Sequence, residues 1–158
     1  MPVTKIKSKW ESGDLVFRDT NGDKVQVLSN DVGNRIIAKV ALTAGLVNSI
    51  ALAWQNPESS KIIVDKVELY LTTAGGTATA VIDVGVVADA ASTADTLIDG
   101  LDVNQTGIFD NITDKGTNGK SRQVVDEKGG TNDYITGKIL TEAAAGLVGY
   151  AYITYFTV

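Results

Sequence analysis

The fold is decided by residues 61–87, which read KIIVDKVELYLTTAGGTATAVIDVGVV. Apolar and polar residues alternate in both halves, and a Thr/Gly-rich segment separates the halves. A period of two is typical of half-buried β-strands, and Gly75 and Gly76 tolerate the positive φ of a turn. The stretch therefore predicts a β-hairpin at the centre of an all-β domain. The side chains expected on its buried face are Ile63, Val67, Leu69 and Leu71, then Ala78, Ala80, Ile82, Val84 and Val86.

Further strands are predicted on both sides of this hairpin. Alternating or apolar runs indicate strands within 36–42, 50–54, 121–125, 134–141 and 147–158. Strands at short spacing with Gly, Asn and Asp in the turns favour a β-sandwich of jelly-roll-like type. One short helix is expected within 92–101, with Ser92 or Thr93 as its N-cap and Leu97, Ile98 and Leu101 on its apolar side.

The N-terminal part is expected to form a unit of its own. Residues 1–33 are interpreted as a small hairpin or arm and residues 34–158 as the sandwich domain. Within 10–28, Asn21-Gly22 separates two alternating runs, which is the pattern of a tight hairpin. Asp19, Asn21 and Asp23 also resemble the start of an EF-hand calcium loop, but Gly22 precedes Asp23, so turn chemistry is favoured over calcium.

The composition argues against standard enzyme chemistry. The chain of 158 residues has neither Cys nor His, which removes thiolates, imidazole bases and the usual catalytic triads. No phosphate-binding loop or dinucleotide fingerprint is present. We therefore expect no enzyme, no catalytic residues and no cofactor. An oxygen-ligand calcium site among Asp110, Asp114 and Asn118 is a less favoured alternative to a polar turn, so no metal is expected.

Charge and hydropathy narrow the partners and the location. The net charge of −5 argues against a nucleic-acid partner, which requires clustered cations. Lys5, Lys7 and Lys9 alternate, which favours a solvated strand edge, with an acidic partner or nucleic acid as the alternative. No apolar run approaches the roughly 20 residues of a membrane span, and no secretory h-region opens the chain. We expect a protein made in the cytoplasm with no membrane partner.

The final strand candidate, LVGYAYITYFTV, is apolar or aromatic on both parities. This pattern predicts burial of both faces, one against the core and the other against a neighbouring subunit. The alternative is a central strand whose tyrosines point to solvent. Because tyrosine is enriched at protein interfaces, Tyr150, Tyr152 and Tyr155 are predicted interface residues.

A family resemblance points to the kind of protein. The runs IALAWQNPESSKIIVDKVELYLTTAGGTATAVIDVGV, LIDG, ITG and AAAGLVGYAYITY resemble small structural proteins of tailed bacteriophages, the capsid decoration (cement) and head-fibre-like proteins. The opening KIKSKWESGDLVFRDTNGDKV is similar to the first hairpin of such virion proteins. The resemblance implies a non-enzymatic β-sandwich, often trimeric, bound to the outside of an icosahedral shell.

The resemblance sets the functional expectation. It implies a protein that binds the outer surface of a phage capsid and stabilises it by bridging major capsid protein subunits. The implied partners are the major capsid protein and further copies in a homotrimer, and the implied location is the virion surface after assembly in the host cytoplasm. Trp10, Leu15 and Phe17 are expected to contact the capsid or a neighbouring copy, because a segment this small cannot hold its own core. Alternatives are a carbohydrate- or receptor-binding module of a fibre or tail, and another virion component such as a tail tube.

Overall fold

The protein was studied as a computed structural model that describes residues 7–11, 14–18, 35–76 and 78–158. The chain divides into two compact units, Met1–Val32 and Gly33–Val158, and each is described by itself. In the first unit, strands β1 (Lys7–Glu11) and β2 (Asp14–Arg18) pair in antiparallel fashion. The register places Trp10 opposite Leu15 and Ser8 opposite Phe17. The last pair of this register is Glu11 opposite Asp14, whereas the predicted Asn21-Gly22 turn lies outside the described residues.

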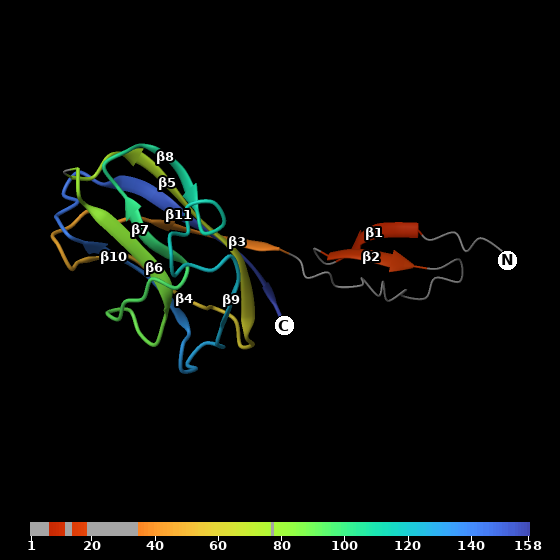
Figure 1. The fold of residues 1–158 in the computed structure, drawn as a ribbon. Coiled ribbons are helices and arrows are strands. Elements are labelled where there is room, and N and C mark those ends of the chain that lie inside the picture. Colours follow the sequence, from red (N-terminus) through yellow and green to blue (C-terminus); the bar gives the residue numbers. More distant parts are fainter. Residues whose placement is uncertain (1–6, 12–13, 19–34, 77) are drawn as a thin grey trace. The chain divides into compact units, whose positions relative to one another are not determined.

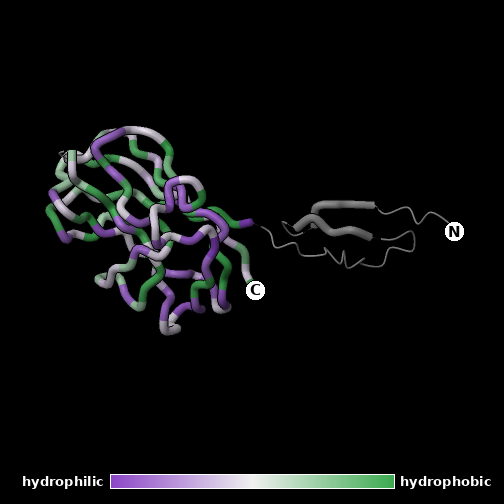
Figure 2. The backbone as a smooth tube through the Cα atoms, in the orientation of Figure 1, coloured by the Kyte–Doolittle hydropathy of each residue, from purple (hydrophilic) through white to green (hydrophobic). Residues whose placement is uncertain are grey.

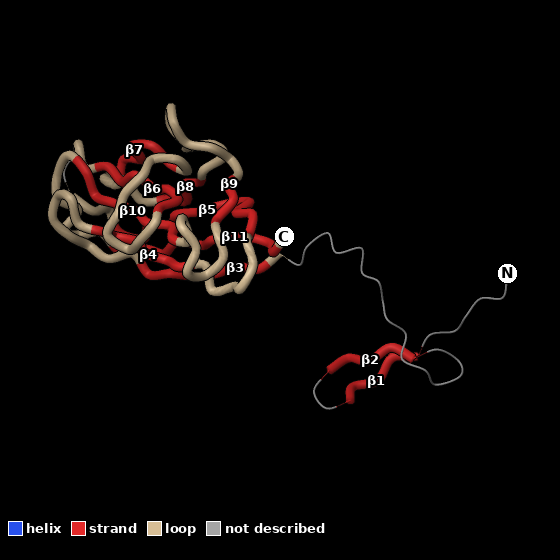
Figure 3. Tube along the Cα trace, turned by 90° about the horizontal axis from the view of Figure 1, so that it is seen from below, coloured by secondary structure: helices blue, strands red, loops and turns tan. Residues whose placement is uncertain are grey.

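The second unit is a sandwich of two antiparallel sheets, which confirms the predicted all-β fold (Figures 1 and 3). One sheet has the order β4-β10-β6-β7, and the other has the order β3-β11-β5-β8, with β9 also paired to β5. The strands are β3 (Ile36–Ala41), β4 (Ile50–Gln55), β5 (Ile62–Thr73), β6 (Val81–Val87), β7 (Ile98–Asp102), β8 (Gly107–Asp110), β9 (Gln123–Val125), β10 (Tyr134–Leu140) and β11 (Val148–Thr157).

The predicted central hairpin is wrong, because β5 and β6 belong to different sheets. β5 pairs with β11, β8 and β9, and β6 pairs with β10 and β7. The connection between them crosses from one sheet to the other, and the Gly75 amide donates to the Val103 carbonyl at 2.8 Å on the way. Gly76 has a φ of 116°, and a Cβ there would lie 2.2 Å from the Ala143 carbonyl oxygen. The glycines therefore serve a crossing and a close backbone approach instead of a hairpin turn.

A bulge in β5 changes which of its residues face the core. Along β11, Thr154 is opposite Lys66 and the next residue, Tyr155, is opposite Val64, so Asp65 is an extra residue in β5. The buried parity therefore switches at Asp65, and the predicted inward position of Ile63 is wrong. The buried residues of β5 are Ile62 and Val64 before the bulge, and Val67, Leu69 and Leu71 after it.

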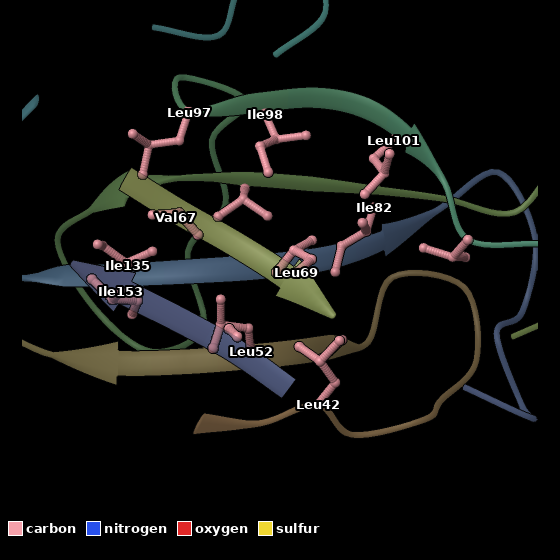
Figure 4. Packing of buried hydrophobic residues seen from close by; sticks show 14 of the residues in the cluster. Leu42, Leu52, Val67, Leu69, Ile82, Leu97, Ile98, Leu101, Ile135 and Ile153 are labelled. Carbon is pink, nitrogen blue, oxygen red and sulfur yellow. The ribbon is translucent and has the colours of Figure 1, made fainter. Parts of the chain in front are cut away.

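The predicted inner face of β6 is largely confirmed. Val86 packs against the core, and Ala80, Ile82 and Val84 are buried, whereas Ala78 is exposed. The core lies between the two sheets, and Figure 4 shows side chains of both pointing into the same layer. Along the chain, hydrophobic and hydrophilic segments alternate as this layering requires (Figure 2). The side chains labelled in Figure 4 are Leu42, Leu52, Val67, Leu69, Ile82, Leu97, Ile98, Leu101, Ile135 and Ile153.

The predicted helix within 92–101 is wrong. Residues 98–102 form β7, and the segment before it is a loop on the outer side of β6. Asp89 accepts hydrogen bonds from the Ala91 and Ser92 amides, both at 2.8 Å, so the polar residues shape a turn and cap no helix. Ala94 covers Gly85, where a Cβ would lie 2.6 Å from the Ala94 backbone. Leu97 and Ile98 are buried because they enter the sandwich core.

Candidate functional site: the outward face of one sheet

The last strand, β11, has two faces of different kind. Its inward residues, Gly149, Ala151, Ile153 and Tyr155, alternate with outward residues. Tyr150 and Tyr152 are half-buried on the outward side, and Tyr155 is only 2% exposed on the inward side. The structure therefore brings two of the three predicted interface tyrosines together and puts the third in the core. The parity of the positions, two even and one odd, already separates them in the sequence.

Tyr155 has a structural role inside the sandwich. Its ring lies 5.4 Å from that of Trp54, measured between centroids. Its hydroxyl donates to Glu58 Oε1 at 3.0 Å. Burial and the bond to the Glu58 carboxylate raise the pKa of Tyr155 to about 12. The phenol therefore stays neutral and ties the β4–β5 connection to the end of β11.

The outward side chains of the β3-β11-β5-β8 sheet form a surface that we call the tyrosine face. It extends over four neighbouring strands and includes the β9 position beside β5. Its members are Ile37, Lys39, Ala41, Ile63, Lys66, Glu68, Tyr70, Ile108, Asp110, Val124, Val148, Tyr150, Tyr152, Thr154 and Phe156.

One row of the tyrosine face is apolar and aromatic. Tyr150 of β11 lies opposite Ala41 of β3 on one side and Tyr70 of β5 on the other. Tyr70 in turn lies opposite Ile108 of β8. Tyr70 is 41% exposed and Ile108 is 62% exposed, although the core behind them is complete. Contiguous exposed apolar area on a sheet face is a common feature of protein-binding surfaces.

The next row carries charges in a fixed order. Lys39 of β3 lies opposite Tyr152 of β11, Tyr152 lies opposite Glu68 of β5, and Glu68 lies opposite Asp110 of β8. The Lys39 ammonium lies 3.8 Å from the ring centroid of Tyr150 and 5.7 Å from that of Tyr152. This is the geometry of a cation–π contact. In the described part of the chain, Lys39 has no ion-pair partner.

Lys66 joins the two carboxylates of this row. It pairs with Glu68 and, at 3.1 Å, with Asp110. The hydrogen bonds to Glu68 and Asp110 raise the pKa of Lys66. Burial opposes ionisation of Asp110, but the Thr113 and Ile112 amides and Lys66 outweigh it and lower the pKa of Asp110 to about 2. We call the part of the tyrosine face on β5 and β8 the β5–β8 flank, and the part on β3 the β3 flank. The β5–β8 flank has a net negative charge, because it carries the carboxylates of Glu68 and Asp110 and the single ammonium of Lys66. The β3 flank is positive at Lys39.

A second ion cluster fixes the bulge of β5. Asp65 accepts from Arg35 at 2.9 Å and from Arg122 at 2.6 Å. Arg35 precedes β3 and Arg122 precedes β9, so the bulge carboxylate connects segments that enter the sheet from different parts of the chain. Both guanidinium groups are about two-thirds exposed, which limits the energy of each pair to about 1 kcal/mol or less.

The Asp110–Asn118 region has the features of a polar turn. Asp110 Oδ1 accepts from the amides of Ile112 and Thr113, and Asp114 Oδ2 accepts from the Asp110 amide at 2.9 Å. Asn118 is directed elsewhere, since its side chain donates to Asp95 at 2.8 Å. Across the described residues, no group of three or more acidic side chains is placed to hold a metal ion.

The long polar segment after β8 is held by one buried amide that the sequence did not single out. The Asn111 side chain is fully buried. Its Oδ1 accepts from the Val67 amide at 2.7 Å, and its Nδ2 donates to the carbonyls of Lys120 and Ser121, both at 3.0 Å. The loop is thereby fixed to β5, next to the tyrosine face.

The other predicted interface residues lie in the N-terminal unit. Trp10 is in β1, and Leu15 and Phe17 are in β2. The strand register brings the backbone positions of Trp10 and Leu15 opposite each other. Their contact with a capsid or with another copy stays a prediction.

The fold and the site define a class of protein: an antiparallel β-sandwich with a separate N-terminal strand pair and an exposed aromatic sheet face. No helix in the described residues is long and apolar enough to cross a membrane. No family model matches the chain, and no curated protein matches it. Among solved structures, a chain of the cyanophage Pam1 capsid asymmetric unit is similar at 16% identity and a TM-score of 0.47, over 88% of this chain and 96% of that chain.

Proposed function

We propose that this protein is a non-enzymatic structural protein of a bacteriophage virion. In this proposal it binds the outer surface of the capsid as a homotrimer and stabilises the shell by bridging major capsid protein subunits. The observation that carries the proposal is the tyrosine face, where a sandwich with a complete core still presents Tyr70 and Ile108 to the outside. Such a face favours a function performed by contact with other proteins. The sequence resemblance to decoration and head-fibre-like proteins supplies the kind of partner.

In this proposal the N-terminal unit and the sandwich have different roles, and the N-terminal unit binds a partner surface. The N-terminal unit contains the two-stranded pair β1–β2, and a two-stranded hairpin is at best marginally stable in water. A partner surface would stabilise it, and Trp10, Leu15 and Phe17 would supply the apolar contacts. The many equivalent sites of a shell turn a modest interface per copy into a large total stabilisation through multivalency.

Cosedimentation with empty shells tests the proposal. The genes beside this one are inspected first, and the major capsid protein found there is assembled into shells that lack this protein. The wild-type protein should sediment with the shells and raise their resistance to heat or urea. Absence of binding would overturn the proposal, and so would binding to defined glycans on an array without binding to shells, which would favour a receptor-binding module.

Full-length variants test the role of the N-terminal unit. The double substitution Trp10→Ala and Phe17→Ala should abolish sedimentation with shells while the circular dichroism of the sandwich is unchanged. Leu46→Ala is the matched control, because Leu46 is 70% exposed on a loop of the sandwich. Equal loss of binding in the control would contradict a contact centred on the N-terminal unit.

A further inference from the structure

We infer that the tyrosine face is the contact between copies of this chain, with the β3 flank of one copy packed against the β5–β8 flank of the next. This inference rests on the homotrimer in the proposed function and names its interface. It does not depend on capsid binding. The partner is a second copy of the same chain, and the argument is charge complementarity within a single sheet face.

The charges lie at one level along the strands and at opposite edges of the face. Lys39, Tyr152, Glu68 and Asp110 are successive cross-strand neighbours from β3 to β8. Lys39 is exposed, and its ammonium lies over the ring of Tyr150. In the described part of the chain, Lys39 forms no ion pair with a carboxylate. The β5–β8 flank has one carboxylate more than Lys66 neutralises. Each flank therefore presents an unbalanced charge of opposite sign.

Symmetry then decides which flanks meet. In a trimer, three tyrosine faces would surround a three-fold axis that runs along the strands. The β3 flank of each copy would then pack against the β5–β8 flank of its neighbour. The same pairing of flanks follows from a two-fold axis parallel to the strands. In both cases Lys39 of one copy approaches Glu68 and Asp110 of the next at the same level, while β11 with Tyr150 and Tyr152 lies near the axis.

The competing face-to-face packing is disfavoured by the same charges. A two-fold axis perpendicular to the strands would put β3 over β3 and β8 over β8. Lys39 would then lie on the side of the partner's positive flank, and Asp110 on the side of its negative flank. Like charges on the same side of an interface repel each other, so that arrangement is less favourable than the complementary one.

The apolar row supplies the contact area that the charges orient. In the complementary packing, Ala41 approaches Ile108 of the next copy, and Tyr150 approaches Tyr70. The two tyrosines on the central strands and Ile108 on the outer strand would bury a large apolar area, and the phenol hydroxyls can form hydrogen bonds across the interface. The Lys39 ammonium over the Tyr150 ring is already held in place on the face, which reduces the entropy cost of the intermolecular ion pair.

Charge exchange tests the inference on the full chain. Sedimentation velocity should show that the wild-type protein self-associates. Lys39→Glu and Glu68→Lys should each weaken the association about tenfold or more. The double variant, Lys39→Glu with Glu68→Lys, should restore it to within about threefold of wild type. Lys128→Glu makes the same charge change at an exposed position of the β9–β10 loop and should leave association unchanged.

A further variant covers the case in which Glu68→Lys disturbs the fold. Ile108→Arg changes a side chain that is 62% exposed, so the sandwich should keep its thermal stability while the association is lost. A wild-type protein that stays monomeric at high concentration would overturn the inference, as would variants at Lys39 and Ile108 that associate like wild type. These measurements contain no capsid, so their failure differs from failure of the shell cosedimentation.

Discussion

Replacing Asn111 by alanine should destabilise the sandwich more than its position in a polar loop implies. The side chain makes three hydrogen bonds, one from the Val67 amide at 2.7 Å and one each to the carbonyls of Lys120 and Ser121 at 3.0 Å. Alanine leaves the Val67 amide buried without its acceptor, which costs about 1–3 kcal/mol. The two lost carbonyl bonds add about 0.5–1.5 kcal/mol each where water cannot replace them.

The expected loss is therefore about 3 kcal/mol in the free energy of unfolding. That is a large part of the roughly 5–15 kcal/mol that stabilises a typical domain. Urea denaturation at fixed protein concentration measures it as a fall in the midpoint at constant m-value. Hydrogen exchange should show in addition that the Val67 amide loses protection, because it has lost its acceptor.

Two control variants separate the hydrogen bonds from the mere change of a loop residue. Asn104→Ala removes an exposed amide side chain and should change the stability by less than about 0.5 kcal/mol. Asn111→Asp keeps an oxygen toward Val67 but directs a second oxygen at two carbonyls, so it should be strongly destabilised near neutral pH and should recover in part when the carboxyl group is protonated. If Asn111→Ala unfolded at the wild-type midpoint with a protected Val67 amide, the reasoning would be refuted.

Three further predictions follow from contacts elsewhere in the sandwich. The pKa of Asp110 is lowered from its ordinary value of 3.8 to about 2 in the folded state. Its ionised form therefore stabilises the fold above about pH 4, and this contribution, about 1 kcal/mol after solvent screening, is lost as the pH falls toward 2. An acid titration by circular dichroism should show the stability difference from Asp110→Asn closing over that range. Gly85→Ala would place a Cβ 2.6 Å from the Ala94 backbone, so calorimetry should show a Tm lower by about 5 °C, and an unchanged Tm would count against the close packing. Tyr155→Phe removes the donor to Glu58 and should cost about 1–2 kcal/mol in wild type but little in a Glu58→Ala background, as a double-mutant cycle would measure.

The existence of most strands could be predicted from local patterns, because each buried strand places its side chains on alternating faces. β10 and β11 follow apolar runs that end at turn residues, and their bounds are close to the predicted ones. β8 was missed because its four residues contain only one side chain, Phe109, that packs against the core. The predicted helix within 92–101 is wrong because a strand, in which Gly100 has a φ of 73°, buries Ile98 and Leu101, and Leu97 is buried just before this strand begins.

The members of the tyrosine face could be predicted less well than its strands, because the face is assembled from five separate segments of the chain. The two-sided pattern of β11 indicated a second buried or interacting surface, and the parity of its positions separates Tyr150 and Tyr152 from Tyr155. Lys39 and Glu68 gave no such signal. They matter only because the register places them on either side of Tyr152, and register between distant segments is not encoded in the local period of either one.

The error at residues 61–87 has the same origin and shows what the local period can and cannot decide. Alternation indicates that a strand has one apolar side, but it does not indicate which strand lies beside it. Two strands that share a core show the same alternation whether they are neighbours in one sheet or members of facing sheets. The bulge at Asp65 adds a second ambiguity, because it reverses the inward parity within one strand. Asp65 is held by Arg35 and Arg122, which lie 30 and 57 positions away in the sequence. The bulge therefore separates a segment with Ile62 and Val64 inward from one with Val67, Leu69 and Leu71 inward, and the local period of β5 contains neither the bulge nor the distant partners of its carboxylate.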